Sequence, residues 1–394
     1  MSPRRIDRSP DLRHLRDDGY DIRIRAGYLV MSGVPYVAAG GGIGRGILVD
    51  QLQLATDETT SGPADHTMRW AGETPCDRTG QPLGLFRDSP DAVTIDAELT
   101  TTHRFSAKPA TPDSDYYVKF TRYVRLITAH AEAIDPTVTA ATFPAIESDD
   151  EDSVFAYTDT ASSRANITAL NDKLCAHRIA IVGVGGTGSY IMDYVAKTEV
   201  KEIHLFDGDT FFLHNAYRSP GVPTREQLDA KPLKVAYHQE RYSGFRRGIV
   251  AHPVYITAAN LDELKSMTFV FLALDRGTPK RAIIERLEEL GIPFIDVGMD
   301  IFRADGALDG VLRVTTSTPS QRDHVREKHR ISLADRNDND DYAQNIQIVE
   351  LNAFNAAMAV IKWKKLIGYY HDAEHEQHSM YTLESNHLLN EDCA

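Results

Sequence analysis

Cysteine is scarce in this chain of 394 residues, which contains only Cys76, Cys175 and Cys393. Three scattered cysteines are too few for a disulfide-stabilised scaffold, and no two of them form a CxxC pair. A zinc site made of four cysteines is therefore excluded. No apolar run approaches membrane-spanning length, and no charged-then-apolar leader follows Met1. These absences predict a cytoplasmic protein with no membrane partner.

An excess of positive charge is also lacking. Lys and Arg together number 43 against 57 Asp and Glu, which gives a net charge of -14. This balance argues against a nucleic-acid partner, because nucleic-acid-binding surfaces are basic. Hydrophobic residues make up 42% of the chain and charged residues 25%, as is typical of globular proteins. The length allows two or three domains.

Residues 1–146 are rich in turn signals. Short alternating runs, such as GYLVMSGVPYVAAG and RGILVDQLQL, predict β-strands. One helix is expected from Asp115, because apolar residues recur there at three- and four-residue steps and so share one face. These residues are Tyr116, Phe120, Tyr123, Ile127, Ala131 and Ile134. We predict a smaller N-terminal α+β domain over residues 1–146, followed by an acidic linker at 147–153.

One stretch of this region, DHTMRWAGETPCDRTG, carries His66, Trp70 and Cys76, and His103 follows later. A group of His and Cys side chains could bind a metal or activate a thiol. We favour the alternative, a tight turn around a buried tryptophan in which backbone groups hold the histidines. Spacing alone does not decide between the two.

From about residue 165 the pattern becomes strand, helix, strand, helix. Expected strands are IAIVG, EIHLF, IVAHPVYIT, TFVFLAL, PFIDVG and DGVLRVTT. Helices are expected at 278–291 and 345–366, the latter with an apolar stripe that we assign to the core, and 318–344 reads as a long polar loop. Apolar strands alternating with amphipathic helices predict a Rossmann-like α/β domain, with a mainly parallel sheet, over residues 147–394.

The first strand of this region runs directly into four glycines, Gly183, Gly185, Gly186 and Gly188. Glycine permits a tight strand-to-helix turn, and the absence of Cβ atoms leaves space for a phosphate at the helix N-terminus. Asp207, 19 residues after Gly188, is placed to accept hydrogen bonds from a ribose. The pattern fits NAD, FAD and ATP alike.

The polar residues that follow distinguish between these nucleotides. They are Asp209, Asn215, Arg218, Lys231, Lys234 and Asp275. Hydride transfer does not need an arginine and a lysine on the phosphates. Cleavage between the α- and β-phosphates does, because negative charge accumulates on the leaving pyrophosphate. Asp275 follows a strand at the edge where ligands lie in α/β sheets, and its carboxylate can hold Mg²⁺. The set favours ATP and Mg²⁺ over NAD.

The ordered motifs GVGGTG, FDGD, HNAYR, KPLKV and LALDRGTPKR resemble the adenylation domain of the ThiF/MoeB and ubiquitin-activating enzyme superfamily, over roughly residues 160–380. The resemblance implies that ATP lies against the glycine loop, Asp207 and Asp209, and that Asn215 and Arg218 contact the nucleotide and its phosphates. It also implies that the family lysine is Lys234, with Lys231 as the alternative, that Asp275 binds Mg²⁺, and that a homodimer forms. Arg164 matches the arginine that members often supply across the dimer interface.

The implied reaction is adenylation of the C-terminal glycine of a ubiquitin-like or sulfur-carrier protein, with a conjugating enzyme as a further partner. Members that form a thioester carry a cysteine in the loop over the sheet, but residues 300–345 contain none. A thioester on that loop is therefore excluded. Of the remaining cysteines, we expect Cys175 in the core and take Cys76 as the better thiol candidate.

Three other functions stay open at this point. A ThiF-fold enzyme could adenylate a small molecule, a peptide or a tRNA base. The chain could instead be a non-catalytic partner subunit, although the full set of phosphate and metal residues argues against that. The third is an NAD-dependent oxidoreductase, which Asn215, Arg218, Lys234 and Asp275 argue against.

Overall fold

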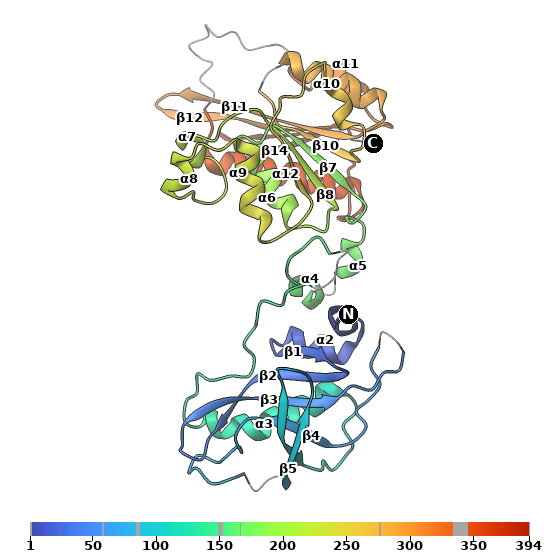
Figure 1. Ribbon diagram of the computed structural model, residues 1–394. Coiled ribbons are helices and arrows are strands. Elements are labelled where there is room, and N and C mark those ends of the chain that lie inside the picture. Colours follow the sequence, from blue (N-terminus) through green and yellow to red (C-terminus); the bar gives the residue numbers. More distant parts are fainter. Residues whose placement is uncertain are drawn as a thin grey trace. The chain divides into compact units, whose positions relative to one another are not determined.

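The computed structural model describes residues 2–56, 59–83, 87–148, 153–165, 167–275, 277–333 and 346–393. The chain forms two compact units, which we call unit 1 and unit 2. Unit 1 comprises residues 1–153 and 157–167, and unit 2 comprises residues 154–156 and 168–394. Figure 1 labels the elements of each unit, which are described separately below.

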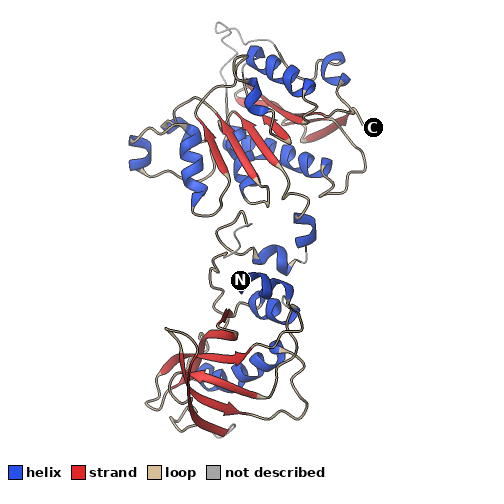
Figure 2. Ribbon diagram, turned by 45° about the vertical axis from the view of Figure 1, so that its right-hand side comes forward, coloured by secondary structure: helices blue, strands red, loops and turns tan. Residues whose placement is uncertain are grey.

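Unit 1 is built on a six-stranded antiparallel sheet with the strand order β1-β2-β3-β4-β6-β5. One long helix, α3, packs against the sheet (Figure 2). The elements are α1 (Ser2–Arg8), α2 (Pro10–Asp17), β1 (Asp21–Arg25), β2 (Tyr28–Val37), β3 (Ile43–Gln51), β4 (Thr67–Ala71), β5 (Arg87–Thr94), β6 (Thr100–Ser106), α3 (Tyr116–Glu132) and α4 (Thr160–Arg164). This arrangement confirms the predicted N-terminal α+β domain.

Helix α3 begins where the sequence predicts. The side chain of Asp115 accepts a hydrogen bond from the backbone N–H of Val118, which caps the first turn. The expected apolar face is buried from Tyr116 to Ala131. Ile134 follows the end of the helix and is exposed, so the stripe is one residue shorter than expected.

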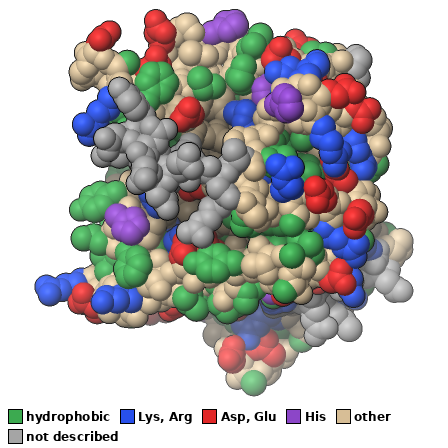
Figure 3. All heavy atoms as spheres, turned by 90° about the horizontal axis from the view of Figure 1, so that it is seen from above, with side chains coloured by type: hydrophobic (Ala, Val, Ile, Leu, Met, Phe, Trp, Pro, Cys, Tyr) green, Lys and Arg blue, Asp and Glu red, His purple; other side chains and the backbone are tan. Residues whose placement is uncertain are grey.

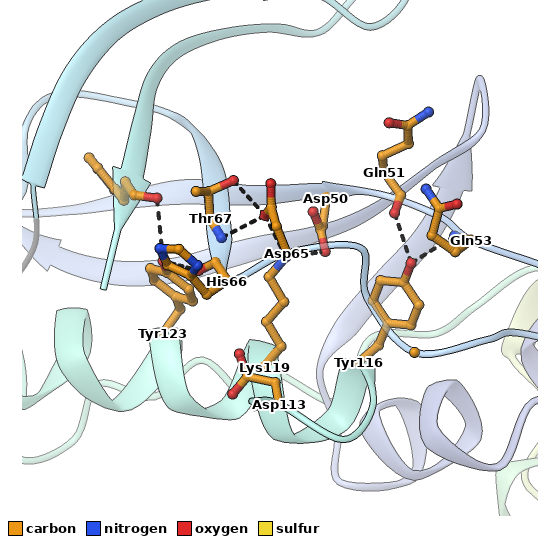
Figure 4. A network of polar contacts seen from close by, with 12 residues as sticks. Asp50, Gln51, Gln53, Asp65, His66, Thr67, Asp113, Tyr116, Lys119 and Tyr123 are labelled. Atoms are coloured by element: carbon orange, nitrogen blue, oxygen red, sulfur yellow. Dashed lines mark hydrogen bonds and ion pairs between the residues drawn. The ribbon is translucent and has the colours of Figure 1, made fainter. Parts of the chain in front are cut away.

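A buried polar network holds α3 against the sheet (Figure 4). The Lys119 ammonium is fully buried and lies 2.6 Å from Asp50 and 3.8 Å from Asp65. The hydroxyls of Tyr116 and Tyr123 donate to backbone oxygens on the sheet side. Burial raises the pKa of Asp50 to about 6, although the neighbouring Lys119 lowers it.

Unit 2 contains an eight-stranded sheet with the order β14-β13-β12-β11-β10-β7-β8-β9. Strands β11, β10, β7, β8 and β9 are parallel, and β12, β13 and β14 are antiparallel. The strands are β7 (Arg178–Val182), β8 (Glu202–Phe206), β9 (Ile249–His252), β10 (Phe269–Leu272), β11 (Phe294–Ala304), β12 (Ala307–Ser317), β13 (His378–Thr382) and β14 (His387–Glu391). The Rossmann-like, mainly parallel fold predicted from the sequence is confirmed.

Helices cover both faces of this sheet (Figure 2). They are α5 (Thr168–Asn171), α6 (Gly186–Ala196), α7 (Leu213–Ala216), α8 (Arg225–Asp229), α9 (Lys234–Ser243), η1 (Leu261–Leu264), α10 (Gly277–Glu289), α11 (Asp323–Glu327) and α12 (Val349–Leu366). Helices α6 and α12 pack together in one apolar core, and α10 closes a second core on the other face. Strand β7 pairs with β8 on one side and β10 on the other, so the strand order reverses at β7. Ligands bind at such a reversal.

The structure corrects several local expectations. The polar stretch 318–344 contains helix α11, with Val325 buried, and residues 334–344 of the predicted loop lie outside the described part. The strand expected at 249–257 ends at His252, and Cys175, expected in the core, is exposed. Among the residues that the structure describes, no helix combines the length and apolar character needed to span a bilayer. On the face shown in Figure 3, Lys and Arg side chains are mixed with Asp and Glu, so that face is not basic.

Candidate active site

A cavity of about 1050 Å³ opens at the carboxyl ends of the parallel strands of unit 2. The glycine loop, the ends of β8, β10 and β11, and residues of α10 and α12 line it. Most of the residues selected from the sequence lie in this lining: Gly183, Gly185, Gly186, Gly188, Asp207, Asp209, Arg218, Lys234 and Asp275. The fold therefore brings together groups that are spread over 93 positions of the chain, from Gly183 to Asp275.

The four glycines of the loop differ in their surroundings. A Cβ on Gly183, whose φ is +89°, would lie 2.4 Å from the backbone oxygen of Ala273, and one on Gly188 would lie 1.9 Å from the Gly183 oxygen. A Cβ on Gly186 would meet the side chains of Asn352 in α12 and of Gln347, which precedes that helix. A Cβ on Gly185 would meet nothing within 4 Å. We therefore assign the space for a phosphate to Gly185, and close packing to the other three.

Asp207 fixes the shape of the loop. One carboxylate oxygen accepts from the backbone N–H of Val184 at 2.9 Å, and the other accepts from the N–H of Asp209 at 2.8 Å. The side chain is 7% exposed. Because both oxygens already have donors within the loop, Asp207 has less capacity for a ribose than the sequence suggested.

Asp209 and Lys234 form an ion pair beside the loop. The Lys234 ammonium lies 2.6 Å from Asp209 and 3.7 Å from Asp207. The Asp209 side chain is half exposed and also accepts from the hydroxyl of Tyr255. Of the two aspartates, Asp209 is thus the one that a ligand in the cavity reaches more readily, and Lys234 is the lysine that meets it.

Arg218 brings a second cation to the cavity. It follows the short helix α7, and its backbone N–H donates to the backbone oxygen of Asn215. Its Nε is buried and has no hydrogen-bond partner among the described residues. Asn215 is itself buried and accepts from the N–H of Phe212, so it shapes this turn without lining the cavity. Lys231 is exposed, has a φ of +46° and is also absent from the lining.

Asp275 lies just beyond the end of β10, exposed in the cavity. Within the described part of the chain, no three His, Cys, Asp or Glu side chains converge as a metal cage would require. Mg²⁺ commonly binds one or two carboxylates together with substrate phosphates and water, so a single carboxylate at this position fits that ion.

A buried charge network that the sequence did not suggest forms another wall of the cavity. Asp296 on β11 is fully buried and lies 2.8 Å from the Lys280 ammonium and 2.6 Å from the Arg313 guanidinium. Lys280 comes from α10 and Arg313 from β12, and both line the cavity. Since the three residues belong to three elements, only the tertiary fold brings them together.

None of the three cysteines lines this cavity. Cys76 is 1% exposed, and burial raises the pKa of its thiol, with a further contribution from Asp77 and Glu73. The expectation that Cys76 is the better thiol candidate is therefore wrong. Cys175 and Cys393 are the exposed ones.

The turn around Trp70 matches the structural interpretation in its buried tryptophan, but hydroxyl groups, not the expected backbone groups, hold the histidines. The indole is fully buried, and its N–H donates to the backbone oxygen of Glu73. The imidazole of His66 pairs with the hydroxyl of Ser106, and that of His103 pairs with the hydroxyl of Thr74.

Arg164 lies in unit 1, at the end of α4. Its guanidinium is over the ring of Phe143, 5.5 Å from the centroid. It is not among the described residues that line the cavity of unit 2. Its action across a dimer interface stays a prediction.

Two family models match the chain, and each covers a different part of it. The model of the ThiF family matches residues 157–389, and the model of a domain of unknown function, DUF6791, matches residues 10–160. No curated protein matches the chain.

Several solved structures are similar to part of the chain. A crystal structure of PaaA is 19% identical, with 57% of this chain and 75% of that chain covered and a TM-score of 0.43. Escherichia coli MccB with ATP is 16% identical, with 58% and 68% covered and a TM-score of 0.43. The microcin C7 biosynthetic enzyme MccB with N-formylated MccA is 15% identical, with 57% and 67% covered and a TM-score of 0.46.

Proposed function

Because the chain belongs to the ThiF family of adenylating enzymes, we propose that unit 2 uses ATP and Mg²⁺ to adenylate the C-terminal glycine of a ubiquitin-like or sulfur-carrier protein. The observation that carries the proposal is the meeting of Arg218, Lys234 and Asp275 with the glycine loop in one cavity. The resemblance drawn from the ordered motifs is confirmed by the family match.

In this reaction an oxygen of the substrate carboxylate attacks the α-phosphorus of ATP. The bond from that phosphorus to the oxygen that bridges it to the β-phosphorus breaks, and pyrophosphate leaves with the electron pair. An acyl-adenylate remains. The step needs positioning and charge stabilisation but no side-chain nucleophile, which agrees with a cavity that no described cysteine lines.

Each polar residue then has a role. The unpaired Nε of Arg218 supplies a donor for the phosphates, and Lys234 turns from Asp209 toward the pyrophosphate as negative charge builds there. Asp275 would hold Mg²⁺, which would neutralise charge on the phosphate oxygens. Asp209, with its half-exposed carboxylate, accepts from the ribose, while Asp207 maintains the loop.

The test is exchange of labelled pyrophosphate into ATP, with a carrier protein that ends in glycine, a short peptide with the same ending, and C-terminally amidated forms of both. We expect exchange only with free carboxylates. Arg218→Ala should lower the rate about 100-fold, the usual scale for losing one charge-stabilising donor. Asp275→Ala should abolish the part of the exchange rate that depends on Mg²⁺. Arg225→Ala, an exposed arginine on α8 away from the lining, is the matched control.

The outcomes separate the candidate functions. Exchange with the peptide but not with the carrier protein would replace the protein substrate by a peptide one. Binding of ATP without exchange for any carboxylate would support a non-catalytic partner subunit instead.

The homodimer and the role of Arg164 are proposed from the family resemblance. Arg164→Ala should lower the exchange rate. It should leave the stability of the chain without ATP unchanged, because the residue is exposed in unit 1. Mixing Arg164→Ala with Arg218→Ala should restore part of the activity if the arginine acts across the interface. A monomer by light scattering that still catalyses exchange would rule out that role.

A further inference from the structure

Helix α12 presents two fully buried asparagines, Asn352 and Asn355, toward the cavity end of the sheet. They stand one helical turn apart, so they share one face. Asn355 lines the cavity directly. The sequence suggested a core helix here, but buried amides are costly unless they are hydrogen-bonded, and each therefore needs an explanation.

Asn352 connects α12 to the glycine loop. Its Oδ1 accepts from the hydroxyl of Thr187 at 2.9 Å. Its amide also occupies the place that a Cβ on Gly186 would take. The start of α12 is thus docked on the loop that we assign to the phosphates.

Asn355 connects the same helix to β11. Its Nδ2 donates to the backbone oxygen of Gly298 at 3.0 Å. A carbonyl oxygen only accepts, so the nitrogen end of the amide must face Gly298 and Oδ1 must face away. Among the described residues, no donor reaches this buried Oδ1. A residue of the cavity lining therefore carries an acceptor that no described donor satisfies.

The strand order indicates which part of the ligand this is. An acid at the end of the second strand marks the ribose side, and Asp207 and Asp209 follow β8. The phosphate loop follows β7, and β10 and β11 lie on the opposite side of β7 from β8. With the nucleotide over β8 and β7, the group that reacts with the α-phosphate lies over β10 and β11, beside Asn355.

We infer that Asn355 Oδ1 accepts the N–H that lies next to the activated carboxylate. Asn355 is then a specificity residue that selects an acyl group bearing an amide on its α-carbon, as the last residue of a polypeptide does. Arg313, which pairs with Asp296, lies close to the same segment of β11, because a Cβ on Gly298 would stand 2.5 Å from its guanidinium. The inference rests on the proposed adenylation.

Two non-hydrolysable mimics of the acyl-adenylate test it. One is 5′-O-(N-acetylglycyl)sulfamoyl adenosine, and the other has the amide N–H replaced by an ester oxygen. The two mimics differ only at the N–H group, whose hydrogen bond we assign to Asn355 Oδ1. Their affinities for the full chain are measured by calorimetry, with ATP affinity as the reference.

We expect the wild-type chain to bind the amide mimic roughly tenfold more tightly than the ester mimic, the scale of one hydrogen bond to a buried acceptor. Asn355→Leu should bind the two mimics equally while keeping its affinity for ATP. Ile361→Ala, an exposed position on the same helix, should discriminate as the wild type does.

Equal binding of the two mimics to the wild-type chain would overturn the inference, whether or not Asn355→Leu folds. Discrimination that persists in Asn355→Leu would also overturn it. Binding of ATP with no gain from either acyl group would show that the acyl group does not lie over β11, which again rejects it. Failure of ATP itself to bind would reject the proposed function on which the inference rests.

Discussion

Gly185 and Gly188 stand three residues apart in one loop but have different surroundings. The space around Gly185 is open toward the cavity, whereas Gly188 lies against the backbone oxygen of Gly183. The glycine pattern in the sequence does not distinguish these two positions. The structure separates the one that faces a ligand from the one that allows the helix to approach the strand.

Gly185→Ala should therefore weaken ATP binding by at least roughly tenfold and leave the fold intact, because its Cβ would occupy only the phosphate space. Gly188→Ala should instead lower the melting temperature, because its Cβ would collide with backbone. Calorimetry with ATP and thermal unfolding distinguish the two effects. Wild-type ATP affinity in Gly185→Ala would place the phosphates elsewhere. Gly186→Val would be a poorer test of the phosphate site, since its side chain would meet Asn352.

The buried carboxyl group of Asp50 should make the stability of unit 1 depend on pH. Burial raises the pKa of this carboxyl to about 6, so the folded chain keeps a proton that the unfolded chain releases near pH 4. The stabilisation is complete below about pH 4 and is lost as the pH rises through about 6. Asp50→Asn should remove this slope. Urea unfolding followed by Trp70 fluorescence, in a Trp363→Phe background, measures it, and an unchanged slope in Asp50→Asn would contradict the assignment.

Helix α6 carries the glycine loop, and a buried arginine completes its C-terminal end. The Arg246 guanidinium donates to backbone oxygens at the end of the helix and in the following turn, among them Val195, Ala196 and Thr198. Burial lowers the pKa of Arg246 to about 10, which still leaves it charged at neutral pH. The last carbonyls of a helix have no partners within it, and here one side chain supplies them.

Arg246→Met should destabilise unit 2 by about 3 kcal/mol, because several buried carbonyls would lose their donor. Arg247→Met, the exposed neighbour, is the matched control and should change stability little. Chemical denaturation of both variants measures the difference. Equal stability of the two would show that water or a rearranged backbone replaces the guanidinium.

The elements of unit 2 could be predicted because their signals are local. Buried parallel strands read as continuous apolar runs, as in FVFL of β10, and the glycine loop marks the turn into α6. The polar residues of α12 could not be assigned in the same way. A helical stripe identifies a buried face, but only the contacts of Asn352 and Asn355 with the glycine loop and β11 show that this face meets the cavity. Asp296 was missed for the same reason, since its partners come from two other elements.

At the scale of the whole molecule, the structure supports a proposed function for unit 2 but not for unit 1. Unit 2 contains the cavity and, apart from Arg164, the residues to which we assign adenylation, all from the part of the chain after Val182. Unit 1 has a well-packed core with Trp70 and α3 at its centre. The cavity of unit 2 does not indicate what unit 1 does. The match to a domain of unknown function covers residues 10–160, which includes most of unit 1.

Replacement of all three cysteines by serine should leave adenylation intact, because none of them lines the cavity and the reaction needs no thiol. Cys76→Ser is compared separately, since that side chain is buried and its loss tests the stability of unit 1. Loss of activity in Cys175→Ser or Cys393→Ser alone, with stability unchanged, would point to a thiol step that this account lacks.

The most direct test of the central claim is to trap the activated carboxylate. The full chain is incubated with ATP, Mg²⁺, hydroxylamine and a glycine-terminated carrier protein or peptide, and the C-terminus is analysed by mass spectrometry. The account predicts a C-terminal hydroxamate that requires ATP, is absent with an amidated C-terminus and is lost in Arg218→Ala. ATP binding with no hydroxamate for any carboxylate, or a hydroxamate that forms equally in Arg218→Ala, would contradict the assignment of this cavity as an adenylation site.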